Sequence, residues 1–517
     1  MLKQGQAVDR FLPSRRKFLK GAIGLPTLVH AQGITPSVVP EQRRPNEHTD
    51  TLRIQRAIDK VSRSGGGTVA LPAGRYVSGT LQMRSRVTLW LGNGATLVMS
   101  KDATEFLPPE KLAYDPKANF ATSNFHVALI VGDGLEHVSI AGEGEIDCDY
   151  TKSGGPKPIA LRRCSNVLVR DITIRNAPSY NISLLGCEFV TIDNVTIRNG
   201  LSDGIDPDCC RHVRISNCFV ESYDDTIVLK ASGALGERRA TEYVTVDNCI
   251  LRTASVYFKC GTESCGDFRN IAISNCTFEG GVGMRHGNPG LAFYTVDGGG
   301  LSNIAASNVV MHRVGTPFTV LRGNRDHCAL GTGPGGVASI RISNIVATEA
   351  RLPSVIAGLP DAPVVGVSIQ GIRVTLAEKV KGSSSITDIA EHPENYPEPI
   401  MFGPLPSHGI FLQHVQDVSV QEFVMEAAEG EELPVIAADD ATNLRLAAIE
   451  TSAHSSPTFW LHNSRNSSVA LAEGSFCRIS GSRSSDLQFP GITPAEIRDR
   501  VEIAADVQAV SFQHTTP

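Results

Sequence analysis

The sequence has few aromatic residues, no excess of positive charge and no long apolar segment. Aromatic side chains make up 6% of its 517 residues, and the formal net charge is −6. Beyond the N-terminus, no stretch approaches the roughly 20 consecutive apolar residues that a membrane-spanning helix needs. These absences argue against a membrane or a nucleic acid as the partner, although a local basic patch could still hold a polyanionic sugar.

The sequence also lacks paired cysteines at metal-binding spacing. Its 12 cysteines are too few for a disulfide scaffold in a chain of this length, and no Cys-x-x-Cys pair occurs. Cys218, Cys249 and Cys276 each follow an asparagine in a repeated Val/Ile-x-Val/Ile-x-Asn-Cys pattern. Because equivalent positions of a repeat fold stack on one another, we expect these three residues to form a buried apolar ladder.

What the sequence does contain is a short strand pattern that recurs many times. Glycine reaches 48 residues, and short Val/Ile-rich runs end repeatedly in Asn or Asp. The anchoring asparagines are spaced by 23, 31, 27, 33 and 36 residues, at Asn194, Asn217, Asn248, Asn275, Asn308 and Asn344. A propeller blade would need about 40–50 residues, so the shorter, irregular repeat favours an all-β parallel β-helix, a solenoid with loops of variable length.

The start of the solenoid carries signs of a cap. Asp50 is suited to an N-cap, and Leu52, Ile54, Ala57, Ile58 and Val61 follow at helical spacing. The pattern predicts one short amphipathic helix that covers the first coil, followed by strands near residues 68–71, 76–77 and 87–89. We expect a single catalytic β-helix domain over residues 45–490 and a C-terminal tail or cap over residues 491–517.

The first 31 residues resemble an export signal. The segment SRRKFLK at residues 14–20 precedes a weakly apolar run and ends near Ala31, as in twin-arginine signal peptides. A disordered basic tail is the alternative interpretation. The signal peptide interpretation predicts a periplasmic or secreted protein.

One segment interrupts the repeat. Residues 379–406 are too long and too rich in proline for a simple connection between strands. Such loops are often functional, so we interpret this one as a wall of a cleft, with an ordinary structural insertion as the alternative.

Asp203 and the pair Asp224-Asp225 are the main candidates for chemistry. They lie 21 and 22 positions apart, about one turn of a solenoid, so their carboxylates are expected to stack. Coils about 4.8 Å apart would place them diagonally at the roughly 6.5–9.5 Å that inverting glycosidases use, although the roughly 5–5.5 Å of retaining enzymes is not excluded. Ordinary turn aspartates are the alternative, but the constellation favours general acid and base catalysis.

These residues resemble a known family. Leu201 to Asp206 reads LSDGID and Tyr223 to Val228 reads YDDTIV, and both are similar to motifs of the polygalacturonase-like glycoside hydrolases of family 28. The segment GGGTVALPAG is also similar, so the resemblance covers most of residues 45–350. It implies a right-handed parallel β-helix of the pectin-lyase-like fold. It also implies an inverting, metal-free hydrolysis in which Asp224 is the acid while Asp203 and Asp225 activate water.

Two family motifs are absent. The histidine that the family carries one coil later has no counterpart in residues 253–258, and its Arg-Ile-Lys motif is missing where Leu291 to Tyr294 stand. Without this pair for binding a carboxylate, a different sugar or another way of holding the acid becomes possible.

Several basic residues could replace the missing motifs. Lys259 follows the aspartates by about one coil, Arg285 could bind a carboxylate, and His286 could take the place of the histidine. Lys230 either binds substrate or neutralises the acidic cluster, while Asp206 and Asp208 are expected to serve turns or to hold the loop. The candidate substrate-binding residues are therefore Lys230, Lys259, Arg285, His286 and Arg322, with Arg325 as a weaker candidate.

The sequence thus predicts a glycosidase that acts on a pectin-like polysaccharide or oligosaccharide. The substrate could contain uronate, and the enzyme is expected to be a monomer that needs neither cofactor nor metal. A calcium-dependent polysaccharide lyase on the same scaffold is one alternative, with the clustered aspartates as calcium ligands. A non-catalytic glycan-binding β-helix is the other, because a fold does not fix a function.

Overall fold

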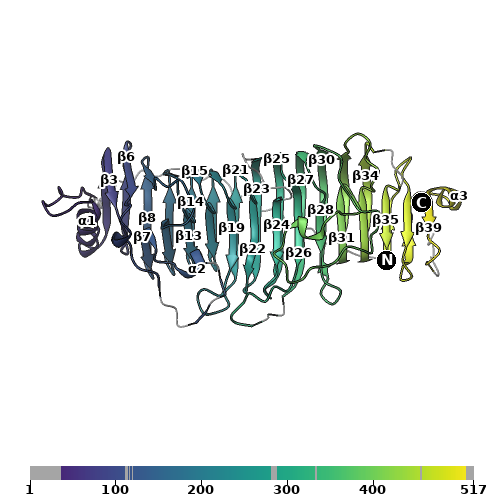
Figure 1. Cartoon of the computed structure of the whole chain (residues 1–517), viewed down its shortest axis with the longest axis horizontal. Helices are drawn as coiled ribbons and strands as arrows, with labels where there is room; N and C mark the ends of the chain where they lie inside the picture. The colour runs from purple at the N-terminus through teal and green to yellow at the C-terminus, as the bar shows by residue number, and fades with distance from the viewer. Residues whose placement is uncertain are drawn as a thin grey trace, which may run out of the picture. The chain divides into compact units, whose positions relative to one another are not determined.

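The computed structural model describes residues 37–110, 114–115, 117–118, 120–280, 288–331, 333, 335–453 and 457–507. The predicted signal peptide lies outside these residues. In the described part, short strands pair in parallel from one coil to the next, as β10 does with β13 and β13 with β16. Figure 1 shows these strands following one another in chain order along the long axis. The predicted right-handed parallel β-helix is confirmed.

Each coil contributes strands to three sheets. The first sheet carries the functional residues described below, and we call it the cleft sheet. Its strands are β4 (Leu81–Gln82), β7 (Ala128–Asp133), β10 (Lys157–Arg162), β13 (Ile182–Leu185), β16 (Ile205–Asp208), β19 (Ile227–Ala231), β22 (Phe258–Ser264), β24 (Pro289–Thr295), β26 (Thr316–Arg322), β28 (Ser354–Ala357), β31 (Ile410–Gln416), β33 (Ile436–Thr442), β35 (Phe459–His462), β37 (Cys477–Ser480) and β39 (Val501–Ile503).

The other two sheets are separate at first and later merge. The second sheet begins with β1 (Ser37–Val38), β2 (Gly67–Leu71), β5 (Val87–Leu91), β8 (Glu136–Gly142), β11 (Ser165–Arg170), β14 (Glu188–Asp193), β17 (Arg211–Ser216) and β20 (Thr241–Asp247). The third consists of β3 (Gly74–Ser78), β6 (Ala95–Met99), β9 (Glu145–Asp147), β12 (Thr173–Arg175), β15 (Thr196–Gly200), β18 (Phe219–Ser222) and β21 (Ile250–Thr253).

One long strand then joins these two sheets. β23 (Phe268–Gly280) pairs with β20 along its first part and with β21 along its second. The stack continues through β25 (Leu301–His312), β27 (Val337–Ala350), β29 (Val364–Val365), β30 (Val367–Leu376), β32 (Ser419–Glu426), β34 (Arg445–Thr451), β36 (Arg465–Val469) and β38 (Ser485–Gln488). Strand pairing thus runs from Ser37 to Ile503, slightly beyond the predicted limits of 45 and 490 at both ends.

The predicted asparagines occupy the bend between the second and third sheets. All six adopt left-handed backbone angles, with φ between 52° and 58°, which asparagine tolerates better than most residues. Asn248, Asn308 and Asn344 each donate an amide hydrogen bond to the asparagine one coil earlier. The other three, Asn194, Asn217 and Asn275, donate instead to aspartates of the preceding coil. The asparagine side chains therefore form a ladder along the bend, with aspartate as a second acceptor.

The interior is one continuous apolar column. It extends from helix α1 (Thr51–Arg63) to β39, and Cys218, Cys249 and Cys276 lie in it with at most 2% of their surface exposed. The predicted cysteine ladder is confirmed. A disulfide between Cys265 and Cys328, which the sequence pattern did not indicate, joins two loops beside the cleft sheet.

Short helices accompany the column. α1 caps the first coil as predicted and buries Ile54, Ala57, Ile58 and Val61, whereas Leu52 stays 57% exposed. Asp50 does not cap the helix with its side chain. Its carboxylate instead accepts hydrogen bonds from the Val77 amide and the Arg53 guanidinium. The remaining helices are η1 (Ala103–Glu105), α2 (Phe120–Ser123), η2 (Pro399–Phe402) and α3 (Pro494–Arg500), and no described helix is long and apolar enough to cross a membrane.

Candidate active site

The three predicted aspartates lie on neighbouring turns that lead into the cleft sheet. Asp203 precedes β16, and Asp224 and Asp225 precede β19. Strand register places Asp203 and Asp225 at equivalent positions of consecutive coils, and the Gly204 amide donates to the Asp225 carbonyl at 2.8 Å. A side chain at Gly204 would place its Cβ 2.4 Å from the next coil, so only glycine permits this approach.

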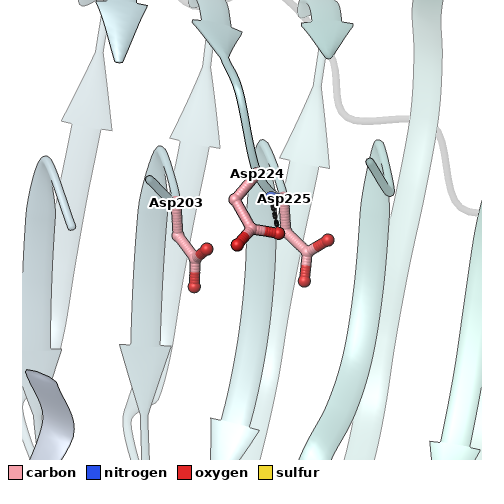
Figure 2. Close-up of side chains that lie close together, drawn as sticks. All are labelled: Asp203, Asp224 and Asp225. Atoms are coloured by element: carbon pink, nitrogen blue, oxygen red, sulfur yellow. Dashed lines mark hydrogen bonds between the residues drawn. The ribbon is translucent and has the colours of Figure 1, made fainter. Parts of the chain in front are cut away.

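The three carboxylates form one cluster, as Figure 2 shows. One oxygen of each lies within 4.8 Å of the others. The nearest oxygens of the cluster are thus closer to one another than the roughly 6.5–9.5 Å of the expected diagonal arrangement between carboxyl groups. The reason is the register, because stacking Asp203 directly against Asp225 leaves only the coil spacing between them.

A cavity of about 290 Å³ opens over these carboxylates. It contains Lys230 and Lys259 of the cleft sheet, as predicted, together with residues from distant parts of the chain. Those that sequence reasoning did not identify include Lys157, Tyr180, Glu263 and Tyr396. We call this space the catalytic cavity.

Lys230 is an internal counter-ion. Its ammonium group contacts Asp203 Oδ2 at 2.9 Å and Asp206 Oδ1 at 2.6 Å, and it lies 3.8 Å from the centre of the Tyr180 ring. Burial disfavours the charged form, but the two carboxylates outweigh it and raise the pKa of Lys230 well above its usual value. Of the two predicted roles, neutralising the acidic cluster is the one these contacts favour.

Lys259 is the counter-ion of Asp225. Its ammonium group contacts Asp225 Oδ2 at 2.9 Å and the Tyr396 hydroxyl at 2.9 Å. Burial would raise the pKa of Asp225, but the positive charge and hydrogen bond of Lys259 hold it below its usual value. Asp225 is therefore ionised at neutral pH.

Asp224 has no ammonium contact among its described partners. Burial and the negative charge of Asp225 raise the pKa of Asp224. Its side chain accepts a hydrogen bond from the Asp225 amide, drawn as the dashed line in Figure 2. The three carboxylates thus differ in proton affinity, which suits a division into acid and base.

Asp203 and Asp206 share one ammonium group. Burial raises the pKa of Asp203 well above its usual value and that of Asp206 to about 6, against the opposing charge of Lys230. Asp206 and Asp208 do not lie in turns, but Asp208 holds the loop that follows β19, which was the other predicted role. Both are strand residues of β16, and Asp208 accepts hydrogen bonds from the backbone and hydroxyl of Ser232.

Ser255 stands in the segment where the family histidine is absent. Its hydroxyl donates to Asp225 Oδ1 at 2.8 Å, and the Val256 amide donates to the same oxygen at 3.2 Å. Together with Lys259, these groups satisfy both oxygens of Asp225 and fix its orientation. No sequence signal distinguished Ser255, because a serine in a turn is common.

Lys157, on β10, is the third lysine of the catalytic cavity. It is 1% exposed, and its described hydrogen-bond partners are the carbonyls of Asn124 and Phe125, at 3.2 and 3.5 Å. Burial lowers the pKa of Lys157 to about 7. The residue escaped prediction because it lies two coils before Asp203, in an ordinary strand.

The other predicted substrate-binding residues lie outside the catalytic cavity or outside the described residues. Arg285 and His286 lie outside the described residues. Arg322, at the end of β26, is not among the residues that line the catalytic cavity, and its predicted role in binding substrate stays a prediction. Arg325 lines a second, open depression that shares Glu263 and Tyr396 with the catalytic cavity. We call this depression the outer basin.

The cluster of Asp203, Asp224 and Asp225 is also the described group whose geometry could hold a metal ion. Two of its three carboxylates, however, already accept hydrogen bonds from the ammonium groups of Lys230 and Lys259. These cations supply the positive charge that a divalent ion would bring, so the residues fit a metal poorly.

Comparison with known proteins agrees with the fold and the cluster. The family described as "Glycosyl hydrolases family 28" matches residues 69–391. A "Probable polygalacturonase" of Vitis vinifera is 24% identical over 365 residues, which cover 64% of this chain and 72% of that protein.

Solved structures support the same fold. The hyperthermoactive exopolygalacturonase of Thermotoga maritima aligns with a TM-score of 0.53 and 22% identity, over 63% of this chain and 83% of that one. The family 28 exopolygalacturonase of Yersinia enterocolitica aligns with a TM-score of 0.54 and 16% identity, over 80% and 78% of the two chains.

Proposed function

The chain belongs to glycosyl hydrolases family 28 and is a glycosidase, and from this membership we propose that it hydrolyses pectin-like chains in the catalytic cavity. The observation that carries the proposal is the asymmetry of the cluster. Asp203 and Asp225 are each held by a buried lysine, whereas Asp224 is partly exposed and has no ammonium contact among its described partners.

Asp224 is the general acid in this proposal. Its raised pKa favours the protonated form, and its exposure lets it reach the oxygen of the leaving sugar. Proton transfer to that oxygen breaks the glycosidic bond and leaves Asp224 ionised.

Asp225 and Asp203 activate the attacking water. Asp225 is ionised because of Lys259, and the positive charge of Lys230 favours the ionised form of Asp203 that a base requires. The water transfers one proton to this pair as its oxygen bonds to the sugar. A later exchange with solvent restores the acid and the base.

The stereochemical course follows from which group attacks the sugar. Resemblance to the family favours inversion, whereas carboxylates whose nearest oxygens lie within 4.8 Å of one another also fit enzymes that form a covalent intermediate, at roughly 5–5.5 Å between carboxyl groups. We propose inversion, because hydrogen bonds occupy both oxygens of Asp225. Proton NMR of the first product formed tests this, since initial retention of the anomer would assign a nucleophile instead.

The substrate we propose contains uronate units. The relative named polygalacturonase supports this class, and Lys157 offers a cavity ammonium group whose described hydrogen bonds go to backbone carbonyls. It would bind a sugar carboxylate that the missing Arg-Ile-Lys motif no longer holds.

We also propose export from the cytoplasm. The predicted signal over residues 1–31 supports it, and so does the Cys265–Cys328 disulfide, since disulfides persist mainly in oxidising compartments. Fractionation of cells that produce the full chain tests this point.

The decisive experiment compares the wild type with Asp224→Asn on polygalacturonate in the presence of EDTA. The wild type should release reducing ends without new ultraviolet absorbance, and the variant should lose at least about 10³-fold in kcat while keeping its thermal midpoint. Activity that disappears with EDTA, or products that absorb in the ultraviolet, would indicate a lyase. Retained turnover in the variant would remove Asp224 from the role of acid.

A further inference from the structure

The long segment between β30 and β31, residues 377–409, reaches into the active site. The sequence predicted that residues 379–406 form a wall of a cleft, and Tyr396 of this segment does line the catalytic cavity. The match to family 28 ends at residue 391, so Tyr396 lies beyond the part of the chain that the family accounts for.

The segment is packed firmly against the cleft sheet. Ile386, Ile389, Phe402 and Leu405 join the outward-facing side chains of β24, β26, β28, β31 and β33 in a second apolar cluster. Gln413 donates to the Ile389 carbonyl at 2.9 Å, and the Asn324 amide donates to the Pro393 carbonyl at 2.7 Å. A side chain at Gly323 would place its Cβ 2.9 Å from that carbonyl oxygen, so glycine permits the close approach.

This packing accounts for the missing Arg-Ile-Lys motif. In β24, Leu291 and Phe293 face the central column, while Ala292 and Tyr294 face outward into the second cluster. Ala292 lies directly beside Lys259 in the strand register. Apolar residues at Ala292 and Tyr294 thus support the 377–409 segment where basic side chains would otherwise face the cleft.

Tyr396 is fixed at several points yet half of its surface is open. Its hydroxyl accepts a hydrogen bond from Lys259, and the Arg325 guanidinium carbon lies 5.8 Å from the centre of the ring. Arg325 is itself held by Asp297, at 2.8 and 3.1 Å. Nevertheless 50% of the Tyr396 surface is exposed, at the boundary between the catalytic cavity and the outer basin.

We propose that Tyr396 is the platform of a sugar-binding subsite built by residues 377–409, on which the unit next to the cleaved one stacks. The proposal rests on the function proposed above and adds the residue that binds this second unit. An aromatic ring has an apolar face that suits the carbon-bound hydrogens of a pyranose, and a ring that is already fixed loses little entropy on binding.

The subsite should recognise the ring rather than its charge. The cations near Tyr396 already have partners, since Arg325 pairs with Asp297 and Lys117 lies 3.6 Å from Asp326. Glu263 adds a negative charge to the outer basin. A uronate, its methyl ester and a neutral hexose should therefore stack on Tyr396 with similar affinity.

Tyr396 also positions Lys259. The ammonium group lies 2.9 Å from the hydroxyl and 5.2 Å from the ring centre, so its close contact is with the hydroxyl. The hydroxyl thereby helps to hold Lys259 on Asp225, and loss of the hydroxyl and loss of the ring should have separable effects.

The test measures binding in the Asp224→Asn protein, so that no substrate is consumed. Calorimetry with galacturonic acid and its oligomers of two to five units should give a gain of at least about tenfold from the first to the second unit. Addition of Tyr396→Ala should abolish that gain, whereas Tyr396→Phe should keep it within about twofold. Tyr243→Ala, at another tyrosine with 50% exposure, is the matched control and should change nothing.

Catalysis by the single variant Tyr396→Phe supplies the second readout. Its KM should stay close to that of the wild type, while the acidic limb of kcat against pH should move to higher pH because Lys259 is less firmly held on Asp225. Equal oligomer binding with and without the Tyr396 ring contradicts the subsite alone. Absence of oligomer binding in the Asp224→Asn protein itself contradicts the proposed function and with it this subsite.

Discussion

At the scale of single residues, two buried lysines assign different protonation to three neighbouring carboxylates. Lys259 keeps Asp225 ionised, and Lys230 is shared by Asp203 and Asp206. The pKa of Asp224 is raised by partial burial and by the negative charge of Asp225. Low-dielectric surroundings amplify each of these differences. The cluster can therefore hold an acid and a base within a few ångströms of each other.

The third cavity lysine leads to a prediction about pH. Burial lowers the pKa of Lys157 to about 7, so its ammonium form is present below that pH and is lost as the pH rises through it. If Lys157 binds a sugar carboxylate, the Kd of Asp224→Asn for trigalacturonate should rise roughly fivefold from pH 7 to pH 8. Calorimetry at a series of pH values measures this.

The control removes the titrating group. In Lys157→Met the affinity should be weak and independent of pH over the same range, while Lys60→Met, an exposed lysine of α1, should behave like the parent. A Kd that changes with pH equally in Lys157→Met would show that another group titrates.

The active-site residues that lie on consecutive coils could be predicted from the sequence, whereas those from other parts of the chain could not. Asp203, Asp224, Asp225, Lys230 and Lys259 were expected together because consecutive coils stack, and they do line one cavity. Lys157 lies two coils before Asp203, and Tyr396 belongs to an insertion far later in the chain. Their proximity depends on packing that periodicity does not encode.

At the scale of elements, the strand pattern of each coil is regular, whereas the loops beside the cleft sheet differ in length. The positions of the strands could be predicted from the asparagine bend, because a left-handed residue at each turn has a clear sequence signature. The merging of the second and third sheets into single long strands had no such signature. The disulfide was missed because a pairing of cysteines cannot be deduced from their number.

The Cys265–Cys328 disulfide carries a stability prediction. It closes a loop of 63 residues and fixes the segment that bears Arg325 beside the outer basin. Replacing both cysteines by serine should lower the free energy of unfolding by about 2–4 kcal/mol and increase hydrogen exchange around residues 323–331. Differential scanning calorimetry and exchange measured by mass spectrometry provide the two readouts.

Reduction supplies an internal control. A reductant in mild denaturant should lower the melting temperature of the wild type to that of the double variant, and should leave the variant unchanged. Equal melting temperatures for the untreated proteins would mean that packing alone holds these loops.

At the scale of the whole molecule, stability comes from one uninterrupted apolar column. Each coil contacts the coils before and after it, so stability is expected to add up from neighbour to neighbour. The helices α1 and α3 lie at the two ends of the coil stack, as Figure 1 shows. The monomeric state expected from the sequence stays a prediction. Cavities in the middle and at the end of the column should therefore have different consequences.

Ile215 and Ile479 allow a direct comparison. Both are almost fully buried in the column. Ile215 lies on β17, among the coils that carry the three aspartates, and Ile479 lies on β37 near the C-terminal end. Ile215→Ala should cost about 2–5 kcal/mol and reduce activity at elevated temperature. Ile479→Ala should open the last coils first and leave activity unchanged.

Hydrogen exchange resolved by coil, combined with residual activity after heating, separates these outcomes. Uniform loss of protection along the chain in both variants would contradict additive, coil-by-coil stability and would indicate a single cooperative unit.

The asparagine bend also makes the contact between coils sensitive to a chemical change of its amides. Asn217 donates its amide to Asp193, and Asn275 donates to Asp247. Spontaneous hydrolysis of either amide would replace a donor by a second negative charge facing a carboxylate. At these turns, as at Asn194 beside Asp171, the replacement of one amide group would convert attraction between neighbouring coils into repulsion.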